Sequence, residues 1–421
     1  MTRFKLATAD TFRSLQHRNF KIFFITQGIS FIGTWIQLAA QTLLVYRLTD
    51  SGTALGLLTA IQFTPTMLLG AWSGVIVDRY DKRRIMRVTA TVMMLTATVL
   101  ATVVALDVVT VPIVYGLAAL FGLANTFDNP ARRTLVNDLV PESEVVNAVA
   151  LNSTLITSAR IIGPAIAGAL ITTVGISWCF GLNALSFIPV LLGLHRMDAS
   201  TFRSRPVARA KGQLRAGLRY AMSIDELRVP LLLMAVVGTL SFNFVVLLPL
   251  LAERDLGGSD VTYTVLTSFF GIGSLLGSLR MARLATIDTR FLGRSSLVLG
   301  IACTALAYAP NVPVAAAILL PAGFASIGVL SGGNAVLQVA ASAEMRGRVL
   351  ALYTVVFLGS TPIGGPIAGW TAQRYGAPAG LLLGSIAAMV AGLAVLAFVR
   401  RRSLLVRGVE VVPEPALVQA V

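Results

Sequence analysis

The chain has 421 residues, of which 56% are hydrophobic and 13% are charged, and its formal net charge is +15. Soluble domains carry about 25% charged residues, and one soluble core could not bury so many apolar side chains. The mean hydropathy of +0.79 therefore excludes an ordinary soluble domain and indicates membrane-spanning segments.

A helix needs about 20 apolar residues to cross a bilayer, and the chain contains twelve segments of suitable length. The sequence therefore predicts an all-α integral membrane protein with twelve transmembrane helices. In chain order they are expected at residues 20–48, 53–77, 85–106, 111–136, 145–173, 176–195, 229–252, 261–284, 291–309, 312–339, 349–373 and 377–399. The polar, basic stretch 1–20 lacks a small-residue cleavage site, so no cleavable signal peptide is expected.

The basic residues predict the orientation of these helices. Of the 34 lysines and arginines, all but four fall in segments on one side. The exceptions are Arg47, Arg254 and Arg374 on the other side and Arg160 inside a helix. Cytoplasmic loops carry an excess of Lys and Arg, so both termini are expected in the cytoplasm. Contact with anionic lipids explains the charge of +15 without a nucleic-acid partner.

A basic, polar linker at residues 197–228 divides the chain into two halves of six helices, 1–196 and 229–402, and a cytoplasmic tail follows at 403–421. Residues 214–222 have an amphipathic pattern that is typical of an interfacial helix. The halves also repeat, because Glu142 followed by Gly163-Pro164 matches Glu344 followed by Gly365-Pro366 at the same offset. This pattern predicts two six-helix repeats related along the membrane normal.

The short charged loop between the second and third helices carries a recognisable pattern. Its residues, with the helix end before it, are Gly74, Asp78, Arg79, Lys82 and Arg83. They resemble the loop between helices 2 and 3 of the major facilitator superfamily, G-x-x-x-D-R-x-x-(K/R)-(R/K), although Asp81 stands where that family usually has glycine. The resemblance implies a conformational switch in which Asp78 sits against the positive N-terminus of another helix and Gly74 permits close helix packing. An ordinary positive-inside loop is the alternative.

The first helix carries a polar stripe on one face. Its members, spaced three and four residues apart, are Gln27, Ser30, Thr34, Gln37 and Gln41. In lipid such a stripe must face protein or a water-filled cavity, so both interhelical hydrogen bonding and cavity lining remain open.

In the major facilitator superfamily, helices 1, 4, 7 and 10 line the central cavity. The resemblance therefore adds polar candidates from the fourth, seventh and tenth helices, namely Tyr115, Asn125, Asn129, Asn243, Asn334 and Gln338. Between them lie the aromatic residues Phe31, Trp35, Phe121, Phe242 and Phe244. Such a lining favours a bulky amphipathic substrate over a small anion, which would need a matched cation near the membrane midplane.

Two charged residues stand out inside the helices. Arg160 lies deep in the fifth helix, where a charge is costly unless it faces the protein interior and has a partner. The candidate partners are Asn152, Asn183 and backbone carbonyls freed near Pro164. Asp128 lies at the cytoplasmic end of the fourth helix. It is expected to pair with the basic residues of the loop, or to remain a solvated loop acid.

A closer resemblance rests on four stretches, which are Asp128…Pro130-Ala131-Arg132, Asn147-Ala148-Val149-Ala150-Leu151-Asn152, Arg160…Gly163-Pro164 and Arg346-Gly347-Arg348-Val349. Together they are similar to the enterobactin-exporter-like branch of that superfamily, and the Gly-Pro pair also resembles the signature of drug:proton antiporters. The branch contains siderophore exporters and drug efflux proteins.

The sequence thus predicts a monomeric proton-coupled exporter of amphipathic small molecules, such as drugs or siderophores, in a bacterial cytoplasmic membrane. Its energy source would be the proton gradient, and no cofactor or metal is expected because Cys179 and Cys303 lie in apolar spans. His17 and His195 are expected to be solvated. An importer of the same fold and a lipid or lysolipid transporter remain alternatives. An enzyme is not expected, since no nucleophile, metal cluster or catalytic dyad is evident.

Overall fold

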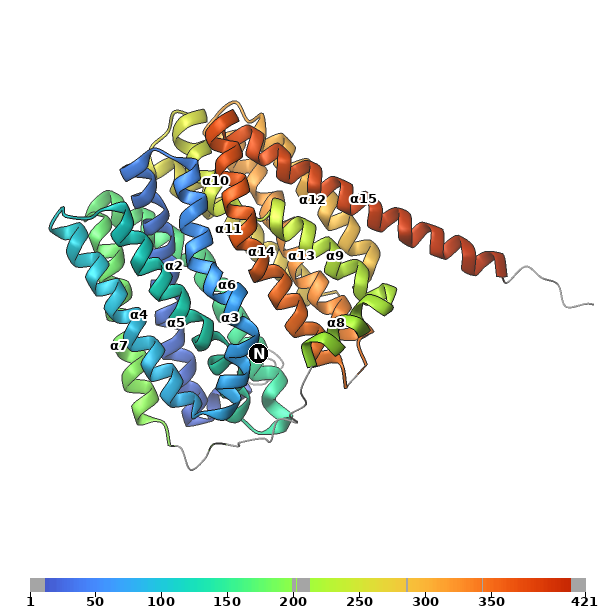
Figure 1. The fold of residues 1–421 in the computed structure, drawn as a ribbon, viewed down its shortest axis with the longest axis horizontal. Helices are drawn as coiled ribbons and strands as arrows, with labels where there is room; N and C mark the ends of the chain where they lie inside the picture. The colour runs from blue at the N-terminus through green and yellow to red at the C-terminus, as the bar shows by residue number, and fades with distance from the viewer. Residues whose placement is uncertain (1–11, 199–201, 203–212, 285–286, 343, 410–421) are drawn as a thin grey trace, which may run out of the picture.

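The structure, a computed structural model, describes residues 12–198, 202, 213–284, 287–342 and 344–409. The described part of the chain is helical and contains twelve helices long and apolar enough to cross a membrane. The prediction of an all-α protein with twelve candidate membrane spans is therefore confirmed (Figure 1).

The first half of the chain supplies six of these helices. They are α2 (Arg18–Thr49), α3 (Gly52–Arg79), α4 (Lys82–Ala105), α5 (Val111–Asp138), α6 (Val145–Thr173) and α7 (Ile176–Arg196). The short 3-10 turns η1 (Arg13–Gln16) and η2 (Glu142–Glu144) precede α2 and α6. Asp81, which departs from the superfamily pattern, caps α4 because its carboxylate accepts hydrogen bonds from the backbone N–H groups of Arg83 and Arg84.

The second half supplies the remaining helices. They are α8 (Gln213–Ser223), α9 (Asp225–Leu240), α10 (Phe244–Leu250), the π-helical turn η4 (Leu251–Asp255), α11 (Asp260–Ala282), α12 (Thr289–Ala307), α13 (Val312–Ala340), α14 (Arg346–Tyr375) and α15 (Ala377–Val409). The amphipathic part of the linker forms α8, whose Tyr220 hydroxyl accepts a hydrogen bond from the N–H of Ser342 at 3.1 Å. The last helix, α15, runs ten residues beyond its predicted end at 399.

The seventh span is not the continuous helix expected at 229–252. It breaks between α9 and α10 and ends in the π-helical turn η4. The hydroxyl of Ser241 donates to the carbonyl of Gly384 at 2.6 Å, and the amide of Asn243 donates to the carbonyl of Thr239 at 2.8 Å. Pro249, which lies inside α10 just before η4, has no N–H to continue the regular helical ladder there. Side chains thus bind backbone groups at the break, as irregular backbone at membrane depth requires.

Helices within each half pack in corresponding pairs. In the first half α3 packs on α5 and α4 on α7, and in the second half α11 packs on α13 and α12 on α15. Glycines bring these helices close together. A Cβ atom at Gly122 would lie 1.9 Å from the carbonyl oxygen of Gln62, and one at Gly323 would lie 2.1 Å from that of Phe270. Larger residues there would force the paired helices apart.

The two halves meet mainly through α3 with α14 and α6 with α11. The α3–α14 contact is tightest at one end of the bundle, where a Cβ at Gly52 or Gly56 would lie 2.8 or 2.5 Å from the carbonyl oxygens of Gly369 and Gly365. We call this the closed end. The other end, where α2 begins and the α3–α4 loop lies, is called the basic end. In Figure 1, α3 and α14 lie close at the top and diverge toward the bottom.

Candidate functional site

A cavity of about 1480 Å³ lies between the two halves. Its lining comes from α2 to α7 in the first half and from the break before α10, α10, α11, α13 and α14 in the second. It reaches solvent at the basic end, where the exposed residues Asp78, Arg79 and Gly347 belong to its lining. The space exceeds the 300–1,000 Å³ or so of common ligand pockets, so it accommodates a bulky small molecule.

The polar stripe of α2 lies along this cavity. All five of its members, Gln27, Ser30, Thr34, Gln37 and Gln41, belong to the lining. Gln37 also bonds between helices, because its carbonyl oxygen accepts a hydrogen bond from the amide of Asn183 on α7 at 2.7 Å. The buried Nε2 of Gln41 has no hydrogen-bond partner among the described residues. The stripe therefore combines both arrangements that the sequence left open.

Four of the other six polar candidates also line the cavity, namely Asn125, Asn129, Asn243 and Asn334. Tyr115 and Gln338 do not belong to its lining. The hydroxyl of Tyr115 donates to the carbonyl of Ala54 on α3 at 2.9 Å, which ties it to a neighbouring helix. Gln338 is exposed, and its amide donates to Asn334 at 3.0 Å.

Aromatic side chains from both halves form the apolar part of the lining. The five that the sequence suggested, Phe31, Trp35, Phe121, Phe242 and Phe244, all belong to it. Phe242 meets Phe357 edge to face at 5.9 Å between ring centroids, and Phe244 meets Phe270 at 4.6 Å. Phe270 and Phe357 were not expected, since they lie on α11 and α14.

Sequence reasoning also missed polar lining residues on three helices. They are Thr59, Gln62 and Thr66 on α3, Tyr263, Thr267 and Ser274 on α11, and Thr354 and Thr361 on α14. The sequence does contain a pattern that indicates the α3 residues, because Thr59, Gln62 and Thr66 are spaced three and four residues apart, as in the α2 stripe.

Asp128 has partners other than those expected. It is buried, its carboxylate lies 2.8 Å from Arg132 one helical turn away, and it accepts a hydrogen bond from the hydroxyl of Thr89 at 2.9 Å. The guanidinium of Arg132 also lies 4.4 Å from the ring centroid of Phe31. Asp128 is therefore held inside the first half and is not a solvated loop acid.

The basic residues of the α3–α4 loop are engaged elsewhere. Lys82 forms an ion pair with Asp138 on α5. Arg83 donates to the carbonyl of Leu194 on α7 at 2.7 Å. Both contacts tie α4 to its neighbours within the first half, so the expected pairing of these residues with Asp128 is not present in this conformation.

Asp78 and Gly74 make no close contact in this conformation. The Asp78 side chain is exposed at the mouth of the cavity and has no hydrogen bond or ion pair to any part of the chain that is described. A Cβ built on Gly74 would have no neighbour within 4 Å. The mouth of the cavity is thus open where the resemblance predicts a docking contact.

Arg160 faces the cavity without either expected amide partner. Its guanidinium lies 5.0 Å from the ring centroid of Trp35 on α2. Its buried Nε has no hydrogen-bond partner within the described ranges. Asn183 is bound to Gln37 instead, and the Oδ1 atom of Asn152 is itself without a partner.

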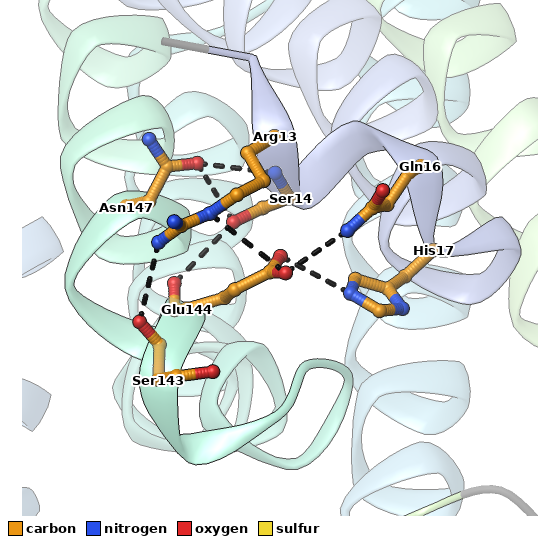
Figure 2. A network of polar contacts seen from close by, with 7 residues as sticks. All are labelled: Arg13, Ser14, Gln16, His17, Ser143, Glu144 and Asn147. Carbon is orange, nitrogen blue, oxygen red and sulfur yellow. Dashed lines mark hydrogen bonds and ion pairs between the residues drawn. The ribbon is translucent and has the colours of Figure 1, made fainter. Parts of the chain in front are cut away.

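A polar network at the basic end fixes the start of α2 against the start of α6 (Figure 2). At its centre the buried carboxylate of Glu144 accepts from the amide of Gln16 at 2.9 Å and lies 3.1 Å from Nε2 of His17. The hydroxyl of Ser14 donates to Asn147 at 2.7 Å. The prediction that His17 is solvated was wrong, because Glu144 binds it.

Comparison with known proteins identifies the family. The sequence profile of the transmembrane secretion effector family matches residues 9–414. The staphyloferrin A transporter of Staphylococcus aureus (strain NCTC 8325 / PS 47) is 24% identical over 267 residues, which is 62% of this chain and 66%, just under two thirds, of that relative. The macrolide efflux protein A of Streptococcus pyogenes is 24% identical over 86% of this chain and 92% of its own length. The multidrug efflux pump Tap of Mycolicibacterium fortuitum is 25% identical over 88% and 93%.

Solved structures share the fold. An inward-facing, unoccupied bacterial homologue of the human lysosomal transporter Spinster has a TM-score of 0.69 and 15% identity, over 90% of this chain and 95% of that one. The nucleoside transporter NupG has a TM-score of 0.69 and 16% identity, over 90% and 98%. The chain therefore belongs to the transmembrane secretion effector family, whose members are multi-pass membrane transporters of the major facilitator superfamily.

Proposed function

We propose that this protein is a proton-coupled secondary active exporter of amphipathic small molecules. The main observation in support is the cavity between the halves, whose lining combines amides, hydroxyls and aromatic rings and which opens at the basic end. A lining of this kind suits a molecule with both an apolar body and polar groups. Relatives named as efflux proteins favour export over import.

The basic end is proposed to be cytoplasmic. The positive-inside rule supports this orientation, since the Lys- and Arg-rich loops gather there. Both termini and the tail 403–421 would then be cytoplasmic, and the structure would represent the inward-open state. The cavity would collect substrate from the cytoplasm in this state.

Two six-helix repeats, 1–196 and 229–402, are proposed to rock against each other. The corresponding helix pairs in each half support this division, as does the concentration of the contacts between the halves in two pairs of helices, α3 with α14 and α6 with α11. Rocking of related halves around a central site is a recognised route to alternating access.

Asp128 is proposed to carry the coupled proton. Among the described lining residues the two acids are Asp78, which is exposed, and Asp128, which is buried against Arg132. Protonating Asp128 would leave the buried Arg132 without its counter-ion, which is costly. Protonation would therefore favour a conformation that solvates Arg132, and this links proton binding to the change of state.

Transport into inverted membrane vesicles tests the proposal. With an acidic vesicle interior, the protein should concentrate a drug or siderophore from a test panel and release protons from the interior. Asp128→Asn should abolish this accumulation and retain exchange of substrate without a gradient. Asp107→Asn, an exposed acid outside the cavity lining, is the matched control and should behave like the parent. The proposal is contradicted if accumulation does not depend on the pH gradient, or if the substrate moves out of the vesicles.

A further inference from the structure

The unsatisfied polar atoms of the protein gather in the cavity. Among the described residues, five buried side-chain atoms lack a hydrogen-bond partner. Three of them, Nε2 of Gln41, Oδ1 of Asn152 and Nε of Arg160, belong to residues that line the cavity. Buried polar groups are normally paired, because desolvation without a partner is costly. Their concentration here indicates groups that a bound molecule completes.

Arg160 lies beside Trp35, where α6 packs closely on α2. The guanidinium lies 5.0 Å from the ring centroid of Trp35. The backbone of α6 packs directly on α2 at this level, since a Cβ on Gly163 would lie 2.4 Å from the Cβ of Trp35. Stacking on an aromatic ring occupies one face of the guanidinium, whereas its N–H groups point outward in the plane. Because Nε has no hydrogen-bond partner among the described residues, this edge can bind an acceptor.

Positively charged residues outnumber negatively charged ones in the described cavity lining. Its described lining contains five arginines, namely Arg79, Arg132, Arg133, Arg160 and Arg348. The two acids are Asp78, at the open mouth, and Asp128, which is paired with Arg132. Arg160 lies 15 residues into α6, or about 22 Å along the helix, and no described acid of the lining pairs with it. A cation at this depth requires a counter-charge.

We propose that Arg160 binds the anionic group, a carboxylate or a phosphate, of an amphipathic substrate. Trp35 holds the guanidinium in place, and the free amide of Gln41, about 9 Å further along α2, adds a second donor. The apolar body of the substrate packs on Phe242 and its partner Phe357. This inference rests on the proposed function, because it names the substrate class of the same cavity. Arg160 would be the matched cation that an anionic group needs inside the cavity.

Binding of a matched pair of probes tests the proposal. The probes are 1-pyrenebutyrate and the neutral 1-pyrenebutanol, which share the same apolar body. Binding to the purified protein in dodecyl maltoside at pH 7.5 is followed by energy transfer from tryptophan to pyrene. A hydrogen-bonded charge pair is expected to favour the carboxylate by about tenfold or more. In Arg160→Gln the carboxylate should lose that advantage, while binding of the alcohol stays within about twofold of the parent.

Two further variants make the test specific. Arg280→Gln removes an exposed arginine outside the cavity lining and should leave both affinities unchanged. Arg160→Lys keeps the charge without the planar fork, so it should retain part of the preference. Equal affinity of the parent for both probes overturns the proposal. So does a full preference for the carboxylate in Arg160→Gln or, if that variant does not fold, in Arg160→Lys.

Competition identifies the source of the anionic group. Displacement of 1-pyrenebutyrate by decanoate, but not by lysophosphatidylglycerol, supports a soluble carboxylate. Displacement by lysophosphatidylglycerol at a lower concentration supports a lipid headgroup, provided that the zwitterionic lysophosphatidylcholine does not compete. Displacement by neither anion overturns the proposal. The binding assay needs no proton gradient and does not measure the direction of transport. A negative binding result therefore does not contradict proton-coupled export, and a negative transport result does not contradict anion binding at Arg160.

Discussion

Asp50 and Arg254 form an ion pair, with 3.1 Å between carboxylate and guanidinium, that joins the end of α2 to the turn η4 at the closed end. Arg254 also donates to Gln373 on α14 at 3.4 Å, and Gln373 accepts from the N–H of Gly52 at 2.7 Å. One guanidinium thus connects segments from both halves. The group of Asp50, Arg254 and Gln373 is called the outer clasp below.

The outer clasp should not titrate in the physiological range. Hydrogen bonds from Tyr46 and then from Arg254 hold the pKa of Asp50 below its usual value of 3.8. Because the folded-state pKa is depressed, the contribution of Asp50 is complete above its unfolded-state pKa and is lost only as the pH falls through the folded value. Closure of this end should therefore be independent of pH between about 5 and 8.

Breaking the outer clasp should shift the protein toward the state in which the closed end opens. Arg254→Gln removes a largely solvent-accessible ion pair, and such pairs contribute about 0.2–1 kcal/mol, which corresponds to a change of up to about fivefold in the equilibrium. Distances between spin labels at the exposed positions Leu48 and Tyr375 measure this opening. The native Cys179 and Cys303 are buried, so labelling should be confined to the introduced cysteines.

The exposed arginine Arg280, outside the clasp, supplies the control. Arg280→Gln should leave the distance distribution unchanged. Asp50→Asn should widen it as Arg254→Gln does, since both variants remove the same pair. An unchanged distribution in both clasp variants would mean that the glycine contacts alone hold this end closed.

Gly56→Ala should disrupt closure of this end more strongly than loss of the outer clasp. The new methyl group would lie 2.5 Å from the carbonyl oxygen of Gly365 and 2.9 Å from Cα of Pro366. Both are backbone atoms that cannot rotate away, so α3 and α14 must separate. We expect transport to fall by about fivefold to a hundredfold, in line with an overpacking cost of about 1–3 kcal/mol that falls on the closed state. Gly116→Ala, where a Cβ meets nothing within 4 Å, should transport normally, and equal activity of the two variants would refute this role of Gly56.

The sequence predicted the span count, because each span is a long apolar run bounded by charges or turn residues. It also predicted the face of α2, since five polar side chains at helical spacing are rare in lipid. The break in the seventh span was missed. Residues 229–252 are apolar almost throughout, and Ser241 at the break binds the carbonyl of Gly384, which lies far away in the sequence.

The sequence did not identify the partners that the charged residues have in this conformation, because these partners depend on packing. Asp128 has a basic residue one turn away on its own helix, Arg132, and pairs with it in this conformation. Its pairing with the basic residues of the loop stays a prediction for the state in which the basic end is closed. Lys82 and Arg83 find acceptors on α5 and α7, which only tertiary packing brings near them. Composition and spacing indicate that a buried charge needs a partner, but they do not identify it.

The α2 stripe provides a test of cavity access. Cysteines at Ser30 and Thr34 should react with a water-soluble maleimide applied from the basic end, since both positions line the cavity. Cysteines at Ile29, which is exposed on the outer surface, and Ile36, which is packed in the core, should not react. Added substrate should slow the reaction at Thr34. Equal labelling of all four positions would reject the cavity assignment.

The open mouth at the basic end bears on the role of Asp78. Asp78 on α3 and Arg348 on α14 line the same mouth from opposite halves and are not joined. The N-terminus of α14 has no side-chain cap, because Met345 occupies the capping position. The N–H groups of Arg346 and Arg348 already bind the backbone carbonyls of Ser342 and Met345, so the positive dipole end of α14 would attract an anion when the mouth closes.

We therefore expect Asp78 to dock on the N-terminus of α14 only in the state in which the basic end is closed. Such a contact contributes about 0.3–2 kcal/mol, and each 1.4 kcal/mol or so shifts the equilibrium between the states about tenfold. The Asp78→Asn variant should insert into the membrane normally, with lower turnover and more maleimide labelling of the cavity from the basic end.

Asp81→Asn is the matched control, because it removes a charge from the same loop while asparagine still caps α4. A cysteine crosslink between positions 78 and 348 should form mainly when the basic end is closed. If Asp78→Asn transports like the parent, or the crosslink forms equally in both states, the loop acts only as a topology signal and the gate lies elsewhere.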